Sequence, residues 1–219
     1  RSRGLGDVYK RQAITALALS PVAWTESAAA GRSVLAIGRD NGNIDLCTWC
    51  EGQSGSIAQG WSPVWTLLGE ENYKIESLAF TASASHLRLF STSGGSIVSE
   101  HFLPSSLTGQ QAADTRTPTR TLSSHGGAIW SMAASPTGKF LAIGCEDGVV
   151  RLIDVAGDAF EHVGTGMHVA PRMTRVASRI LSLAWGPPRR QMATSNDSDD
   201  DNDEAWRDTY LLGGLGNST

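Results

Sequence analysis

Glycines at a constant spacing constrain the fold of this 219-residue chain more than any other feature. Gly42, Gly95 and Gly148 follow one another at intervals of 53 residues, and each lies just before a short apolar run. The tetrapeptide Leu-Ala-Ile-Gly precedes two of them, at Leu35–Gly38 and Leu141–Gly144. A glycine between two apolar runs is typical of the tight turn of a β-hairpin, because such turns need positive φ. The spacing therefore predicts a repeated hairpin unit.

A second repeated pattern indicates the number of units. Strand patterns that begin with isoleucine open at Ile14, Ile75, Ile129 and Ile180. Units of three or four short strands cannot bury both faces alone, but they can when they stack radially as blades of a β-propeller. The sequence thus predicts an all-β chain with four blades, at about 13–60, 61–121, 122–170 and 171–219. The aromatic strand pattern that starts at Trp61 also suits an outer strand of the first blade.

The third unit carries the most specific motif. His125-Gly126 precedes its first strand pattern, Ser135-Pro136 ends that pattern, and Asp147-Gly148 occupies the next turn. This arrangement resembles a WD40 repeat in which Ile153-Asp154 replaces the usual Trp-Asp, so we expect a weaker hydrogen-bonded network within the blade. The resemblance implies about four blades of a seven- or eight-bladed propeller, and hence a fragment. The residues expected to stabilise the blade are His125, Asp147, Gly148 and Asp154.

Two segments do not follow the repeat. Residues 1–12 share no pattern with the units, and we interpret them as a foreign or artefactual leader. Residues 195–206 contain six acidic residues, which account for −6 of a net charge of −4 and leave +2 for the rest of the chain. Such a composition buries too little apolar surface to fold. We therefore expect a disordered acidic loop inserted into the fourth blade, with Ser198 as a candidate phosphorylation site.

The bulk properties exclude several classes of function. No apolar run approaches the roughly 18–20 residues that span a bilayer, and no dense basic face marks an autonomous nucleic-acid-binding domain. The Cys47-Thr48-Trp49-Cys50 motif lacks the second ligand pair of a zinc site, so the three cysteines are interpreted as reduced thiols of an intracellular protein. No Gly-rich phosphate loop, nucleophile elbow or H-E-x-x-H motif occurs, which predicts a protein that is not an enzyme and holds no cofactor.

Three stretches resemble one WD40 family in particular. Gly126–Pro136, Gly144–Leu152 and Ser178–Trp185 are similar, in order and separation, to the cirhin family, also called the U3 small nucleolar RNA-associated protein 4 family. The resemblance implies a non-catalytic scaffold of the U3 small nucleolar ribonucleoprotein and small-subunit processome in the nucleolus. It further implies support of pre-rRNA processing, 18S rRNA maturation and rRNA transcription. The implied partners are other processome proteins and the pre-rRNA complex, with no membrane.

The surface that contacts partners is predicted less sharply. Arginines of the fourth unit can neutralise phosphates, although solvated loop arginines explain them equally well. These candidate RNA or partner contacts are Arg172, Arg175, Arg179, Arg189 and Arg190. The candidate anchoring tryptophans are Trp24, Trp49, Trp61, Trp65, Trp130 and Trp185. We expect core packing for Trp130 and Trp185, since both fall within strand patterns. A generic WD40 adaptor, such as a substrate receptor of a ubiquitin ligase, is the alternative function, because the fold alone allows both.

Overall fold

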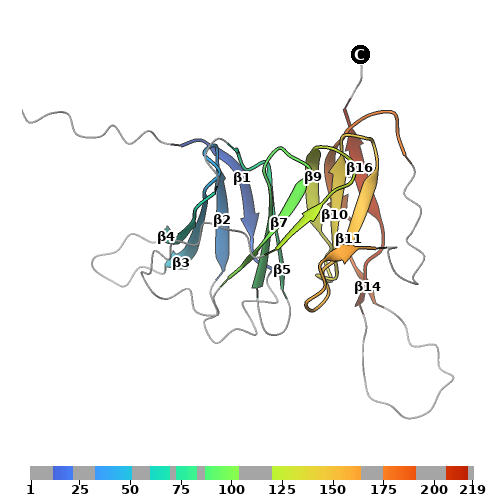
Figure 1. Ribbon diagram of the computed structural model, residues 1–219. Coiled ribbons are helices and arrows are strands. Elements are labelled where there is room, and N and C mark those ends of the chain that lie inside the picture. Colours follow the sequence, from blue (N-terminus) through green and yellow to red (C-terminus); the bar gives the residue numbers. More distant parts are fainter. Residues whose placement is uncertain are drawn as a thin grey trace, which may run out of the picture.

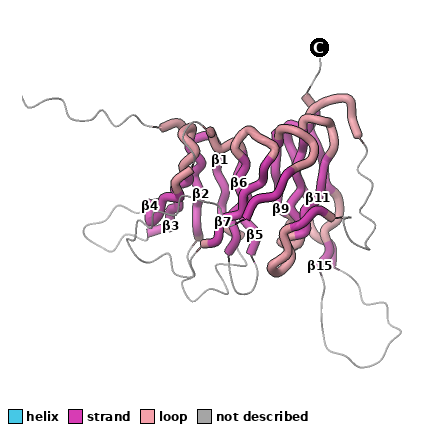
Figure 2. The backbone as a smooth tube through the Cα atoms, in the orientation of Figure 1, coloured by secondary structure: helices cyan, strands magenta, loops and turns pink. Residues whose placement is uncertain are grey.

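The computed structural model describes residues 12–21, 33–50, 60–69, 73–82, 87–103, 120–163, 175–190 and 206–216. Strands joined by turns make up the regular structure of these residues, which confirms the predicted all-β class (Figure 2). No helix in this part of the chain is long and apolar enough to cross a membrane. The predicted leader, apart from Gln12, and the predicted acidic insertion, apart from Trp206, lie outside the described residues.

The first two blades are four-stranded antiparallel sheets in which each strand pairs with the next. The first contains β1 (Ile14–Leu19), β2 (Val34–Arg39), β3 (Ile44–Cys50) and β4 (Gly60–Leu67). The second contains β5 (Ser77–Ala82), β6 (Leu87–Thr92), β7 (Ile97–Phe102) and β8 (Arg120–Ser123). Side chains of β2 alternate between buried and half-buried positions, as the two-residue period of a strand requires.

The third blade repeats this plan, and the fourth varies it. The third contains β9 (Ile129–Ala134), β10 (Phe140–Cys145), β11 (Val150–Asp154) and β12 (Glu161–His162). In the fourth, β13 (Ile180–Trp185) pairs with β16 (Leu211–Leu215), and β14 (Arg189–Arg190) pairs with β15 (Trp206–Arg207). Trp206 therefore begins a strand, although the predicted insertion extends to this residue.

The repeated glycines occupy left-handed turn positions in two of the three cases. Gly42 and Gly148 have φ values of 86° and 76° in the β2–β3 and β10–β11 turns. Glycine adopts such values without the steric cost that other residues meet. In the second blade the positive φ belongs to Gly94, at 70°, and not to Gly95. The glycine with positive φ in that turn thus comes one residue before the glycine that fits the 53-residue spacing.

The strand pairing moves two of the predicted blade boundaries. β4 pairs with β3, which places residues 60–67 in the first blade and not in the predicted second blade, 61–121. β8 pairs with β7 and continues to Ser123, beyond the predicted end of that blade. An alternating sequence pattern shows that a segment is a strand, but it does not show which neighbour accepts its hydrogen bonds.

The four blades stand side by side in chain order, as the colours from blue to red show in Figure 1. Their first strands contact one another in series, β1 with β5, β5 with β9 and β9 with β13. This series places the first strand of each blade innermost, as in a propeller. One hydrophobic core, around Leu46 and Leu89, joins the first and second blades, and another, around Phe90 and Ile143, joins the second and third.

A contact between glycine and isoleucine repeats at two of the blade junctions. Gly38 on β2 faces Ile75, and Gly144 on β10 faces Ile180. In both pairs, a Cβ added to the glycine would lie 2.6 Å from the isoleucine Cγ2. Only glycine leaves room for the next blade to approach this closely. The Leu-Ala-Ile-Gly pattern and the opening isoleucines are therefore two sides of one packing contact.

The junction between the second and third blades is built around a buried ion pair. Arg88 on β6 and Glu100 on β7 are 1% and 0% exposed, and the Arg88 Nε lies 2.5 Å from the Glu100 Oε1. Arg88 also donates three hydrogen bonds, of 2.6, 2.8 and 2.8 Å, to carbonyl oxygens of the loop at 155–159. Arg120 on β8 donates to the other Glu100 oxygen at 2.6 Å. Arg88, Glu100 and Arg120, here called the Arg88 cluster, thus fix a loop of the third blade to the second.

Candidate interface site

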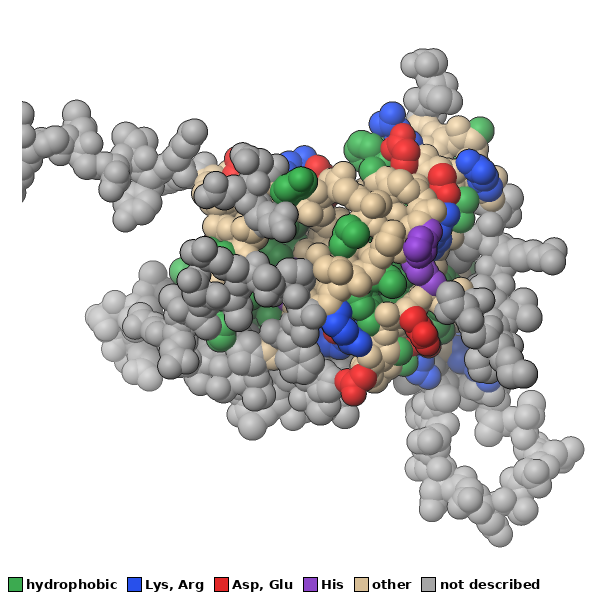
Figure 3. Space-filling model, in the orientation of Figure 1, with side chains coloured by type: hydrophobic (Ala, Val, Ile, Leu, Met, Phe, Trp, Pro, Cys, Tyr) green, Lys and Arg blue, Asp and Glu red, His purple; other side chains and the backbone are tan. Residues whose placement is uncertain are grey.

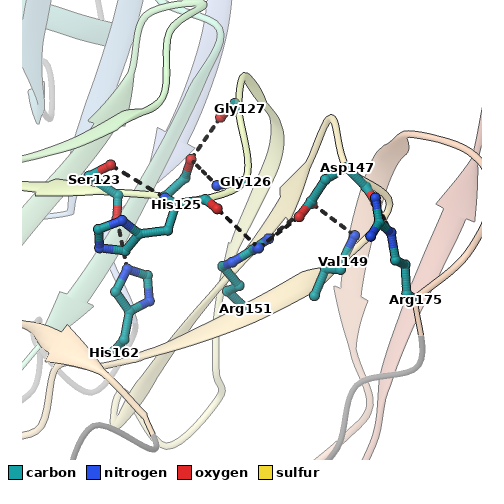
Figure 4. A network of polar contacts seen from close by, with 10 residues as sticks. Ser123, His125, Gly126, Gly127, Asp147, Val149, Arg151, His162 and Arg175 are labelled. Atoms are coloured by element: carbon teal, nitrogen blue, oxygen red, sulfur yellow. Dashed lines mark hydrogen bonds and ion pairs between the residues drawn. The ribbon is translucent and has the colours of Figure 1, made fainter.

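Asp147 and Arg151 form the centre of a polar network at one rim of the third blade (Figure 4). The Arg151 Nη1 and Nη2 atoms donate to the two carboxylate oxygens at 3.0 and 2.7 Å. The Nη2 atom also reaches the carbonyl oxygen of His125 at 3.3 Å. The hydrogen bonds from Arg151 hold the pKa of the Asp147 carboxyl below its usual range. The network joins the β10–β11 turn to the loop that precedes β9.

The WD40 resemblance implies a network within the blade that links a histidine, a serine or threonine, an aspartate and a tryptophan, and the observed network differs from it. Asp147 is held by Arg151, while the His125 ring packs beside the His162 ring with centroids 5.3 Å apart. Ile153, which stands where the tryptophan is expected, is fully buried in the core. The aspartate of the motif is therefore held by an arginine on the neighbouring strand, and His125 contributes its carbonyl oxygen.

Two other residues were expected to stabilise the blade. Gly148 lies in the turn before β11, and Asp154 is the last residue of β11. A Cβ on Gly148 would collide with the carbonyl oxygen of Val176, so glycine lets the segment before β13 cross the β10–β11 turn. The Val176 N–H donates to the Gly148 carbonyl oxygen at 3.0 Å. Asp154 Oδ1 accepts a hydrogen bond from the Ala156 N–H at 2.9 Å. Both residues thus fix the chain where it turns out of a strand.

The predicted contact arginines do not form one patch. Arg175 and Arg179 precede β13, whereas Arg189 and Arg190 form β14 beyond its other end. The six-residue β13 is about 20 Å long, and Figure 1 shows β14 at the end of the blade away from the C terminus. Arg172 lies outside the described residues. Figure 3 likewise shows positive and negative side chains interspersed over the third and fourth blades.

The candidate tryptophans take several environments. Trp49 and Trp61 meet edge to face across β3 and β4, with ring centroids 5.5 Å apart. Trp65 is partly buried against the first hydrophobic core. Trp185 is half-buried, and its indole N–H donates to a carbonyl oxygen of β9 at 3.0 Å, so it joins the third and fourth blades. Trp24, like Ser198, falls in a part of the chain that the structure does not describe.

Trp130 contradicts the prediction that it packs in the core. It is 40% exposed, whereas its neighbours Ile129 and Ser131 on β9 are buried. Successive side chains of a strand point to opposite faces, so the burial of both neighbours turns Trp130 outward. Its indole N–H donates to the Glu146 carboxylate, and the Arg179 guanidinium lies 5.0 Å from the ring centroid. Arg179 is paired in turn with Glu146 at 3.1 Å.

Trp130, Glu146 and Arg179, here called the rim site, come from three separate segments. They lie on β9, in the β10–β11 turn and just before β13. Sequence reasoning named two of them as separate candidates but missed Glu146 and the contact. The repeat held a partial signal, because Arg179 comes directly before the opening Ile180 and Trp130 directly after the opening Ile129.

Two buried thiols and one buried imidazole have shifted pKa values. Cys47 and Cys145 are free, and burial raises the pKa of both thiols. The side chain of Cys50 is outside the described ones. The His101 Nε2 lies 2.8 Å from the Ser91 Oγ, and burial lowers the pKa of His101 to about 4. Among the residues that the structure places, no three His, Cys, Asp or Glu side chains gather as a metal site.

Comparison with known proteins identifies the class of the fold. The model of the WD domain, G-beta repeat, matches residues 116–154, which include β8 to β11. A chain in the structure of a humanized mutant of the Chaetomium thermophilum Polycomb Repressive Complex 2 has a TM-score of 0.50 at 16% identity. The match covers 69% of this chain and 30% of that chain, and it shows the fold alone. The chain therefore has the fold of β-propeller blades, as predicted, and its third blade matches a WD40 repeat.

Among individual proteins, the chain is similar to U3 small nucleolar RNA-associated protein 4. It is 32% identical to the Saccharomyces cerevisiae protein, over 69% of this chain and 17% of that protein. It is also 32% identical to the Schizosaccharomyces pombe protein, over 80% and 21% respectively. The Homo sapiens homolog is 42% identical over 32% of this chain and 9% of its own length. These matches confirm the predicted resemblance, and the chain spans about a fifth of the length of the two yeast relatives.

Proposed function

We propose that the chain is part of a non-catalytic scaffold that works in the U3 small nucleolar ribonucleoprotein, or small-subunit processome, during ribosome biogenesis. The observation that carries the proposal is its similarity to U3 small nucleolar RNA-associated protein 4 over 69% and 80% of the chain in two yeasts. The proposal includes nucleolar localisation and support of pre-rRNA processing, 18S rRNA maturation and rRNA transcription. The partners are other processome proteins and the pre-rRNA complex.

The geometry suits a scaffold because the blades are fixed to one another. The Arg88 cluster, the two glycine–isoleucine contacts and the hydrogen bond from Trp185 each connect neighbouring blades. The rim site presents an exposed aromatic ring and an exposed arginine. Tryptophan and arginine are enriched among the residues that dominate binding energy at interfaces. A rigid frame with such side chains on its rim can hold partners in a fixed arrangement.

Affinity purification of the tagged full-length protein from cells tests the proposal. We expect U3 small nucleolar RNA and pre-rRNA to co-purify, together with other proteins of the same particle, as measured by RNA quantification and mass spectrometry. The same purification from untagged cells is the control. A preparation that lacks both RNAs and contains a ubiquitin-ligase core would contradict the proposal and support the generic adaptor function.

A further inference from the structure

The rim site holds an exposed indole in a fixed orientation. The Trp130 N–H is bonded to Glu146, its ring lies under the Arg179 guanidinium, and Arg179 is paired with Glu146. Each of the three groups is thus held by the other two. The ring nevertheless remains 40% exposed. A rigid aromatic ring binds a ligand with a small loss of conformational entropy, because its rotamer is already fixed.

Positive charge exceeds negative charge beside the indole. Arg151 and Arg179 are paired with Asp147 and Glu146, respectively. Arg175 donates to the carbonyl oxygen of Asp147 at 3.0 Å, and its charge also lowers the pKa of the Asp147 carboxyl. Arg175 is exposed and contacts the same turn that supplies Glu146. Among the described residues at this turn, three arginines accompany two carboxylates, which leaves an excess of one positive charge.

These two features together favour one chemical class of ligand. A cationic ligand is disfavoured, because the ring already carries the Arg179 guanidinium and Arg175 adds repulsion. A lone phosphate would pair with the arginines but would make no use of the indole. An unpaired nucleotide uses both, since its base stacks on an aromatic ring and its phosphate pairs with arginine.

We propose that the rim site binds an unpaired nucleotide of RNA, with the base stacked on Trp130 and a phosphate paired with Arg175. This inference rests on the proposed function, under which the protein works in a particle that contains RNA. Trp130 lies near the start of β9, at the same edge of the blade as the β10–β11 turn. Arg189 and Arg190 take no part, because they lie beyond the opposite end of β13.

Binding of labelled RNA to the purified full-length protein tests the inference. Single-stranded oligouridine and oligoadenosine of about eight nucleotides and an RNA duplex are the probes, with fluorescence anisotropy as the readout. We expect single strands to bind more tightly than the duplex, and Trp130→Ala to weaken single-strand binding by about tenfold or more. Trp130→Phe should retain most of the affinity, because it keeps a ring for stacking. Arg175→Ala should make the affinity depend less steeply on salt concentration, by roughly one phosphate contact.

Two matched variants separate the site from general effects of the substitutions. Trp61→Ala removes a tryptophan that is 39% exposed on the first blade, almost the exposure of Trp130. Arg189→Ala removes an exposed arginine at the other end of the fourth blade. Both should leave the affinity within about twofold of the wild type, because neither residue contacts the rim site. Equal affinities of the Trp130→Ala variant and the wild type, or an equal loss in Trp61→Ala, would overturn the inference.

A second measurement keeps the inference distinct from the proposed function. Co-purification of U3 small nucleolar RNA with the tagged wild-type protein tests the function, whatever the oligonucleotide affinities are. If the wild type co-purifies the RNA while Trp130→Ala leaves oligonucleotide binding unchanged, the inference is wrong and the function stands. If Trp130→Ala instead removes a protein subunit from the particle at unchanged RNA affinity, the rim site is a protein contact, and the inference is overturned.

Discussion

Two neighbouring blade junctions hold the same kind of sheet together by different physical means. Between the third and fourth blades, Gly144 makes room for Ile180, whose carbonyl oxygen accepts a hydrogen bond from the Ser131 hydroxyl at 2.9 Å. Between the second and third blades, the equivalent fifth residue of the strand is Ser91, which is bonded to a histidine. The Arg88 cluster connects these two blades in addition to the hydrophobic core around Phe90 and Ile143.

The same blade architecture can therefore be joined to its neighbour either by close apolar packing or with the help of a buried ion pair. The glycine–isoleucine contact depends on shape, and it can repeat wherever the same short pattern repeats. The buried ion pair depends on a complete set of partners, because removing one partner leaves a charge without solvent or counterion. The second–third junction is therefore expected to be the more sensitive of the two to single substitutions.

Breaking the ionic junction should have the largest effect. Arg88→Met leaves Glu100 buried with Arg120 as its remaining partner, and it leaves three carbonyl oxygens of the 155–159 loop without their donor. We expect a loss of about 3 kcal/mol in local stability, measured by hydrogen–deuterium exchange of β6 and that loop in the full-length protein. The double variant with Glu100→Met should regain the part of the loss that comes from the buried Glu100 charge, whereas the three carbonyl oxygens stay without their donor. A loss below about 1 kcal/mol in the single variant would show that the pair is not what holds the junction.

Overpacking the apolar junction should have the next largest effect. In Gly144→Ala the new methyl group would collide with the Ser131 Oγ and would lie 2.6 Å from the Ile180 Cγ2, so both the Ser131–Ile180 hydrogen bond and the approach of β13 to β10 must change. We expect a loss of about 2 kcal/mol, seen as faster exchange in β13. Gly60→Ala is the control, because a Cβ there meets no atom within 4 Å. Similar losses in both variants would indicate that backbone propensity, and not the contact with Ile180, explains the effect.

The histidine beside Ser91 should make the second blade sensitive to acid. The pKa of His101 is lowered to about 4 by burial, so the unfolded chain binds the proton more readily. Stability is then present above the unfolded pKa of about 6.5 and falls as the pH drops toward 4, by about 2 kcal/mol between pH 8 and pH 5. Urea denaturation at both pH values measures the loss. The His101→Asn variant should show a smaller difference, and an equal difference would contradict the assignment to His101.

The partly buried ion pair of the third blade should contribute least. Asp147→Asn removes the charge that Arg151 neutralises, at a site that is only partly buried. We expect a loss below about 1 kcal/mol at neutral pH. The lowered pKa of Asp147 contributes stability above its unfolded value of about 4 that is lost as the pH falls. The stabilities of the variant and the wild type should therefore approach each other as the pH falls below about 4. A loss as large as that of Arg88→Met would contradict the distinction between the two networks.

The features that could be predicted from the sequence are those that depend on local chemistry. Turn glycines such as Gly42 and Gly148 follow from backbone sterics, and the opening isoleucines follow from strand patterning, so both could be found without a structure. The Arg88 cluster could not, because Arg88 looks like a solvated residue in a strand until its partners 67 to 71 residues away are known. Trp130 was misassigned because an apolar residue in a strand pattern is ordinarily buried. Its exposure depends on which side chains of β9 face the two neighbouring blades.

Depletion and rescue in cells tests the central claim most directly, with the ratio of mature 18S rRNA to large-subunit rRNA as the measurement. If the protein is a scaffold of the U3 particle, its depletion lowers this ratio, and the wild-type full-length protein restores it. An unchanged ratio after effective depletion would contradict the claim.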